Sequence, residues 1–289
     1  MNKKLLFVII LGLILVIGGI NQLFVVQQDD TDNDIKEPNT NQHAPHKKQN
    51  KQQKPKKKAK EGTVKERVDS FFKRSKDVFA NKDTHVVAIG DSLTQGVGDT
   101  TNSGGYVGVL DEIVNDDQKT ATFDNFGHAG DRTDQLLKRM KDPRVQTSLK
   151  RADIVLITVG ANDIMKILRD NITDLNYKNF KKEQPAYEER LTTIFDNLSN
   201  LNDSAEIYLV GFYNPFEQYF ADVPELDQIV EDWNSIGEKV TSTEDQFHYI
   251  PTKDLFDKAE KDLFYEDNFH PNNDGYEKMA ERVLNYIDK

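Results

Sequence analysis

The segment HVVAIGDSL, residues 85–93 of this 289-residue chain, is the most informative one for the fold. Residues 85–89 form a short run rich in β-branched side chains, which is typical of a buried strand. Gly90 and Asp91 then allow a sharp turn, and Ser92 follows at the sheet edge, where its hydroxyl can face a ligand. The same residues also fit a simpler interpretation, in which Asp91 or Ser92 only caps a helix. The choice between the two depends on the rest of the chain.

Strand-like and helix-like segments alternate from this point to the C-terminus. Short runs rich in apolar or β-branched residues predict strands at His85–Ile89, Asp153–Val159, Glu206–Gly211 and Phe247–Ile250. Thr122–Phe126 is a further strand candidate. Apolar residues at helical spacing predict helices at Tyr106–Val114, Thr133–Met140, Tyr187–Leu201, Leu226–Val240 and Asn273–Ile287. Apolar strands that are each followed by a helix indicate an α/β fold with a mostly parallel sheet covered on both faces. In such folds, ligands bind at the carboxyl ends of the strands.

Chemically useful side chains follow three of the predicted strands, and a fourth group lies near the C-terminus. The four groups are Gly90-Asp91-Ser92-Leu93, Asn125 to Thr133, Gly160-Ala161-Asn162-Asp163 and Asp267-Asn268-Phe269-His270. Together they offer a serine nucleophile, donors for a developing oxyanion, an imidazole base and a carboxylate that could orient the base. Separately, Gly130 could be a turn residue, Asn162 a helix cap and His270 a loop histidine. Their order along the chain favours a catalytic site.

In this combination, the four groups resemble the sequence blocks of the GDSL or SGNH hydrolases, over about His85 to Ile287. The resemblance implies a flavodoxin-like three-layer α/β/α fold. It also implies roles for single residues: Ser92 as nucleophile, His270 as base, Asp267 as the acid that orients the base, and Gly130 and Asn162 as oxyanion donors together with the Ser92 N–H. Such a site hydrolyses esters in two acyl-transfer steps and requires no metal or organic cofactor.

The nearest match is the extracytoplasmic lipase/acylhydrolase-like branch of Gram-positive bacteria. Two features support this placement: the apolar N-terminal segment, residues 5–26, which we interpret as a membrane anchor, and the segment Tyr213-Asn214-Pro215-Phe216. This predicts hydrolysis of a carboxylic ester, on a lipid or a short acyl chain. A second interpretation is removal of O-acetyl groups from a wall or surface polysaccharide. A third is a catalytically silent module that binds a glycan or a lipid, although intact Ser92, Asn162 and His270 argue against it.

Other polar residues near these groups are weaker candidates. His128 lies in the second group and competes with His270 for the role of base, but Gly130 explains that loop better. Asp91 and Asp163 fit turn stabilisation better than proton transfer. No tight His/Asp spacing of the zinc type supports a metal site built from His128 and His270. The G-x-S-x-G pattern is absent, so Ser92 does not lie in an α/β-hydrolase turn.

An aromatic cluster follows the fourth predicted strand. Its members are Phe212, Tyr213, Phe216, Tyr219 and Phe220. These side chains would either line an acyl pocket or pack beneath a loop, and the sequence favours neither.

The N-terminal region predicts a membrane anchor. Leu5–Val26 is long enough to cross a bilayer as a helix at about 1.5 Å per residue. A cleaved signal peptide is the alternative, but no alanine of an A-x-A cleavage site occurs before Ala44. Lys3 and Lys4 precede the span and acidic residues follow it. By the positive-inside rule, residues 1–4 are expected in the cytoplasm and the catalytic domain outside the cell.

A polar tether is predicted to join this anchor to the hydrolase domain. Residues 27–62 are nearly free of large apolar side chains, so we expect them to be disordered. His46–Lys60 holds eight lysines. This stretch either binds anionic lipid headgroups or an anionic wall polymer, or serves only as a soluble spacer. The domain itself is assigned to residues 63–289 and is expected to open with an amphipathic helix at Thr63–Asn81.

Composition excludes several classes of function. The net charge is −11, and the tether carries an excess of lysine, so the domain alone is more acidic than the whole chain. An acidic domain argues against nucleic acid as a partner, because phosphate binding needs a basic face. The chain has no cysteine, which excludes disulfides, a cysteine nucleophile and thiolate metal sites.

Overall fold

The computed structural model describes residues 83–289, except 117–118, 216–223, 258, 260–261 and 288–289. The predicted cytoplasmic end, anchor, tether and lead-in helix (1–4, 5–26, 27–62 and 63–81) lie outside the described residues, as do Phe216, Tyr219 and Phe220. Among the helices that are described, none is both long enough and apolar enough to cross a bilayer.

Five parallel strands form the central sheet. They are β1 (Thr84–Gly90), β2 (Ala121–Gly127), β3 (Ile154–Thr158), β4 (Glu206–Val210) and β5 (Phe247–Ile250). Their spatial order is β2-β1-β3-β4-β5, and every neighbouring pair is parallel. This is the order of flavodoxin-like sheets. The expected α/β class with a parallel sheet is confirmed.

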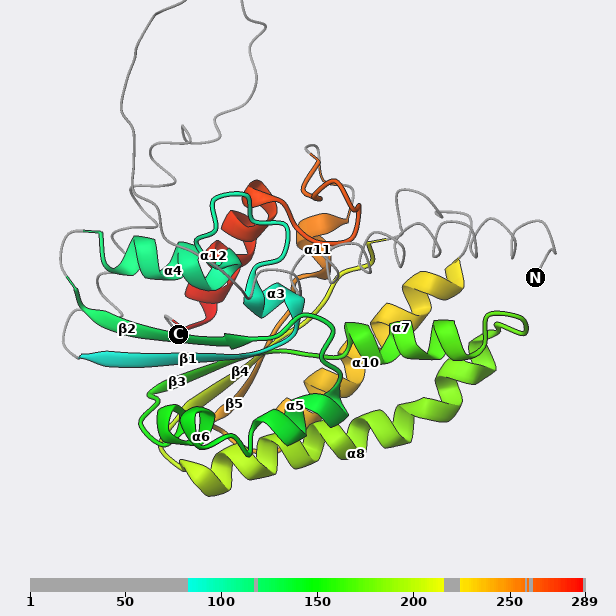
Figure 1. The fold of residues 1–289 in the computed structure, drawn as a ribbon. Coiled ribbons are helices and arrows are strands. Elements are labelled where there is room, and N and C mark those ends of the chain that lie inside the picture. The colour runs from blue at the N-terminus through cyan, green and yellow to red at the C-terminus, as the bar shows by residue number, and fades with distance from the viewer. Residues whose placement is uncertain (1–82, 117–118, 216–223, 258, 260–261, 288–289) are drawn as a thin grey trace, which may run out of the picture.

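Helices cover both faces of the sheet (Figure 1). On one face lie α4 (Gly105–Val114), α11 (Lys253–Phe256) and α12 (Asn273–Ile287), and on the other α5 (Thr133–Arg139), α6 (Pro143–Leu149), α7 (Ala161–Asp170), α8 (Tyr177–Leu201) and α10 (Pro224–Thr241). Successive strand residues point to opposite faces. Val87 and Ile89 therefore join the core beneath α8 and α10, whereas Val86 and Ala88 join the core beneath α4 and α12.

Helix α8 differs from the sequence expectation. The predicted start at Tyr187 is wrong, because the helix begins at Tyr177 and continues through Pro185. A proline inside a helix normally signals a break, since it lacks an N–H and crowds the preceding turn. Here the Asn176 side chain caps the start by accepting from the Lys178 N–H, and Phe180 is buried in the core. Tertiary packing therefore overrides the local signal. Helices α3, α6, α7 and α11 are also absent from the expected set.

The chain reverses direction along the sheet between β1 and β3. From β1 the chain moves outward to β2, and it then returns to the other side of β1 to form β3. Ligands bind in the crevice at such a switch point, beyond the carboxyl ends of the strands. The short helix α3 (Ser92–Gln95) follows β1 at this point, and Asn162 lies in the first turn after β3.

Candidate active site

The turn after β1 places Ser92 at the switch point. Gly90 has φ +146°, and a Cβ there would lie 2.2 Å from the Thr158 carbonyl oxygen, so only glycine fits this crossing. Asp91 caps α3 by accepting a hydrogen bond from the Leu93 N–H at 3.1 Å. Ser92 is therefore both a helix-terminal residue and the candidate nucleophile. Only 6% of its surface is exposed.

The C-terminal group supplies an imidazole to this serine. His270 Nε2 lies 2.8 Å from Ser92 Oγ, and His270 Nδ1 lies 2.6 Å from Asp267 Oδ2. The other carboxylate oxygen of Asp267 accepts the backbone N–H groups of Phe269 and His270, each at 2.9 Å. The fold thus brings together three predicted site residues in the order serine, histidine, aspartate. The Ser92 and His270 positions are 178 residues apart in the sequence.

The environment of Asp267 favours its ionised form. Burial raises the pKa of this carboxyl, but the hydrogen bond and charge of His270 and the two backbone N–H groups outweigh burial and hold it below its usual value. An ionised Asp267 selects the tautomer in which His270 carries its proton on Nδ1. His270 Nε2 is then available to accept the proton of Ser92.

The loop that carries Gly130 is held against the nucleophile turn. The His128 N–H donates to the Gly90 carbonyl at 2.9 Å, and the Ala129 N–H donates to the Gln95 side chain at 2.6 Å. Gly130 has φ +85°, a conformation that favours glycine.

The Asn162 amide reaches the same loop from α7. Asn162 Nδ2 donates to the Asp131 carbonyl at 3.1 Å. A side-chain amide carries two N–H groups, so this bond leaves a second one as a potential donor. The structure therefore brings Gly130 and Asn162 into neighbouring positions, while their role as oxyanion donors stays a prediction.

The competing residues have other partners. His128 Nδ1 lies 3.0 Å from Asp131 Oδ1, and its side chain is 61% exposed. Asp163 accepts from the backbone and side chain of Thr133. The imidazole that contacts Ser92 is that of His270. Over the described part of the chain, no three His, Asp or Glu side chains gather as a metal-binding group would.

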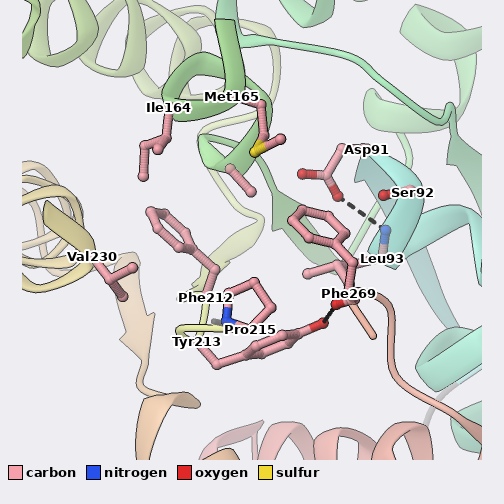
Figure 2. Close-up of a pocket in the computed structure, with 11 residues that line it drawn as sticks. Asp91, Ser92, Leu93, Ile164, Met165, Phe212, Tyr213, Pro215, Val230 and Phe269 are labelled. Atoms are coloured by element: carbon pink, nitrogen blue, oxygen red, sulfur yellow. Dashed lines mark hydrogen bonds between the residues drawn. The ribbon is translucent and has the colours of Figure 1, made fainter. Parts of the chain in front are cut away.

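An apolar pocket of about 40 Å³ adjoins Ser92. Its lining residues are Asp91, Ser92, Leu93, Ala161, Ile164, Met165, Phe212, Tyr213, Pro215, Val230 and Phe269. Figure 2 shows Asp91 and Ser92 on one side of the pocket and Ile164 and Val230 on the opposite side. Of the aromatic cluster, the two described members, Phe212 and Tyr213, line this pocket and are also buried. That the pocket takes an acyl chain stays a prediction.

Several contacts that support the site have no signal in the sequence. Thr158, at the end of β3, donates its hydroxyl to Asp91 at 2.7 Å. The Tyr213 hydroxyl donates to the Phe269 carbonyl at 2.9 Å and so holds the loop that carries His270. Arg139 pairs with buried Asp131 and donates to the Gly90 carbonyl. Each contact joins residues that are distant in the chain or have no local pattern, so only the fold reveals them.

Asp91 lies fully buried beside the nucleophile. Burial raises its pKa to about 6, although the Thr158 hydroxyl and the Leu93 N–H lower it in part. A carboxyl with a raised pKa binds its proton more tightly in the folded state. Protonated Asp91 therefore contributes its full stabilisation of the folded state below about pH 4, and this stabilisation is lost as the pH rises through 6.

Replacing Asp91 with asparagine should remove this pH dependence. One Asp91 oxygen accepts both bonds from Leu93 and Thr158, and an asparagine carbonyl can do the same without ionising. Relative to the variant, the wild type should lose about 2 kcal/mol of stability between pH 4.5 and pH 8. Urea unfolding of both proteins at the two pH values measures this. A stability difference that is the same at both would show that Asp91 does not titrate in this range.

The fold and the site together define a three-layer α/β/α protein with a serine, a histidine and an aspartate in hydrogen-bonding order at the switch point. The sequence profile of the GDSL-like lipase/acylhydrolase family matches residues 88–278. The chain belongs to this family, whose members hydrolyse esters.

The chain is similar to several known proteins. The chain is 39% identical over 208 residues to the uncharacterized protein YpmR of Bacillus subtilis (strain 168), covering 71% of this chain and 81% of YpmR. It is 24% identical to the spore germination lipase LipC of Bacillus licheniformis, covering 68% of this chain and 92% of LipC. The lipase Lip_vut3 from a goat rumen metagenome has a similar fold, with a TM-score of 0.60 and 22% identity over 69% of this chain and 95% of that one.

Proposed function

We propose that this protein is a carboxylic ester hydrolase that acts through an acyl-enzyme on Ser92. The observation that carries the proposal is the hydrogen-bonded order of Ser92, His270 and Asp267, at 2.8 and 2.6 Å. A serine hydroxyl is a weak nucleophile by itself, and a base within hydrogen-bonding distance activates it. Membership of the GDSL-like lipase/acylhydrolase family supports the same conclusion.

The reaction proceeds in two steps at this site. His270 Nε2 takes the proton of Ser92 Oγ as the oxygen attacks the ester carbonyl, and the same nitrogen then protonates the departing alcohol. The tetrahedral oxyanion accepts hydrogen bonds from the Ser92 and Gly130 N–H groups and from the Asn162 amide. Water, activated by His270, then attacks the acyl-enzyme and releases the acid. Asp267 stabilises the imidazolium that forms in each step.

The pocket beside Ser92 selects an ester with a short apolar acyl chain. Its walls are mainly aliphatic and aromatic, and its volume is about 40 Å³. A single water needs about 10–15 Å³ on this measure, so the pocket holds a chain of only a few carbons. The alcohol part of the ester then extends away from this pocket.

Chain length should therefore control the rate. We expect kcat/KM for p-nitrophenyl esters to be highest with two to four acyl carbons and to fall at least about tenfold by eight, since each misfit methylene costs about 1–3 kcal/mol. Met165→Ala should move the optimum toward longer chains, because Met165 lines the pocket. Met140→Ala is the matched control, being equally buried in the same core but outside the pocket lining. A profile that Met165→Ala leaves unchanged would place the acyl chain elsewhere.

A fluorophosphonate probe tests the proposed function directly. Wild-type protein of residues 63–289 should become covalently labelled, and it should hydrolyse short p-nitrophenyl esters in the same preparation. A folded wild type that is neither labelled nor active on any ester would overturn the proposal and favour the silent glycan- or lipid-binding module.

Removal of O-acetyl groups from a wall or surface polysaccharide is the second candidate. The small pocket supports it, because an acetyl group fits in the volume available. Activity confined to acetyl esters, including those of an acetylated glycan, would favour this candidate. Turnover of butanoyl or hexanoyl esters at comparable kcat/KM would favour a lipase or acylhydrolase.

We further propose that residues 5–26 anchor the protein in the cell membrane, with the domain outside. The support is the span of 22 residues, apolar except for Asn21 and Gln22, and the lysines that precede it. The lysine-rich tether would then lie close to anionic headgroups or wall polymer. Mass spectrometry of the protein from its native host tests this, because a mature form lacking residues 1–26 would contradict an uncleaved anchor.

A further inference from the structure

A buried carboxylate joins the two loops that carry the candidate oxyanion donors. Asp163, in the first turn of α7, is 5% exposed. Its Oδ2 accepts the Thr133 N–H at 3.0 Å, and its Oδ1 accepts the Thr133 hydroxyl at 2.7 Å. Thr133 begins α5 and lies three residues after Gly130. Asp163 itself directly follows Asn162, so its bonds to Thr133 join the segment that carries Asn162 to the segment that carries Gly130.

An arginine from a third helix fixes this carboxylate. Arg190, on α8, donates from Nη2 to Asp163 Oδ1 at 3.2 Å and from Nε to the Thr133 hydroxyl at 2.7 Å. Its planar guanidinium therefore bonds both members of the Asp163–Thr133 pair at once. The start of α5 and the start of α7 are tied to each other and to the long helix α8.

The Gly130 loop thus docks onto α7 at two consecutive residues. Asn162 bonds the Asp131 carbonyl at 3.1 Å, and Asp163 bonds Thr133. If the second bond were lost, Asn162 alone of these two α7 residues would still bond the loop, and its amide must also face the oxyanion. Electrostatic stabilisation of a transition state depends on donors that are already in place, and a misplacement of about 1 Å can cost about a hundredfold in rate.

We propose that Asp163, held by Arg190, is a positioning residue that sets the spacing between Gly130 and Asn162. The inference rests on the proposed function, because it assigns a task to residues around the same oxyanion site. Asp163 lies outside the lining of the pocket and acts through its neighbours. Its effect should therefore appear in the transition state and not in the binding of the ester.

Asp163→Asn is the informative substitution. Asparagine has the same shape, but one carboxylate oxygen becomes an amide nitrogen. The new side chain cannot accept both bonds from Thr133, and it presents no charge to Arg190. We expect kcat to fall 10- to 100-fold, KM to stay within threefold, and the midpoint of the pH–rate profile to stay unchanged, since Asp267 and His270 are untouched.

A double-mutant cycle with Asn162→Ala separates positioning from general stability. Asn162→Ala alone should lower kcat about 10²–10³-fold. If Asp163 acts through the oxyanion donors, adding Asp163→Asn should cost no more than another threefold. Full multiplication of the two effects, or an unchanged kcat in Asp163→Asn alone, would overturn the proposal.

Two further variants serve as a second test and as a control. Arg190→Lys keeps the positive charge but loses the planar guanidinium that bonds Asp163 and Thr133 at the same time. It should therefore lower kcat by less than Asp163→Asn does. If Asp163→Asn does not fold, the kcat of Arg190→Lys tests the proposal instead.

Asp124→Asn is the matched control. Asp124 also bonds two side chains from other elements, the Ser148 hydroxyl and the His85 imidazole, and these lie away from Ser92. This variant should leave kcat within threefold of the wild type. An inactive wild type would contradict the proposed function. A normal kcat in Asp163→Asn, with an active wild type, would contradict only the positioning role of Asp163.

Discussion

Replacing Ser92 with alanine should lower kcat/KM for ester hydrolysis by about 10⁴- to 10⁶-fold and abolish fluorophosphonate labelling. In the proposed mechanism, the substitution removes the atom that forms the acyl bond, while the candidate oxyanion donors and the pocket remain. Ser92 Oγ is bonded to His270, but α3 is capped through Asp91, so the turn should keep its shape. Circular dichroism and thermal unfolding should match those of the wild type.

The matched control for this experiment is a second buried serine. Ser148 is 3% exposed and bonds Asp124, away from the switch point. Ser148→Ala should keep labelling and lose no more than about threefold in kcat/KM. Label that persists in Ser92→Ala, or that disappears in Ser148→Ala, would show that Ser92 is not the nucleophile.

A similar loss is expected when His270 becomes alanine. Without its Nε2 at 2.8 Å, Ser92 has no base to take its proton, and the departing alcohol has no acid. In enzymes of this type, losing the base costs nearly as much as losing the nucleophile, because the two act as a unit. We therefore expect a loss of about 10⁴-fold or more in kcat, with a KM close to that of the wild type. Steady-state kinetics on a short p-nitrophenyl ester measures both constants.

His128 provides the comparison that makes the result specific. Its imidazole is 61% exposed and contacts Asp131, and in the sequence it competes with His270. His128→Ala should change kcat by no more than about threefold. A large loss in His128→Ala, with His270→Ala still active, would reverse the assignment of the base and contradict the proposed mechanism.

Local signals in the sequence were sufficient for the sheet. The five predicted strands occur at the predicted places. For β1, β3 and β4 the reason is that buried parallel strands are short, mainly apolar runs. β2 lies at the edge of the sheet, is only partly buried and carries Asp124 and Asn125. The same signals misplaced the start of α8, since Pro185 indicates a break that packing around Phe180 and Tyr187 does not permit. They also missed short α3, which has only one turn and no periodicity to detect.

From the sequence one can predict the α/β class, the order of the four polar groups, and five candidate site residues, Ser92, Gly130, Asn162, Asp267 and His270. Each of these features lies in a local pattern of a few residues. Only the folded protein shows which of these residues touch, how large the pocket is, and that Arg190 and Asp163 bond Thr133 beside the Gly130 loop. These contacts join side chains far apart in the chain. Each depends on where several elements pack, and no short segment carries that information.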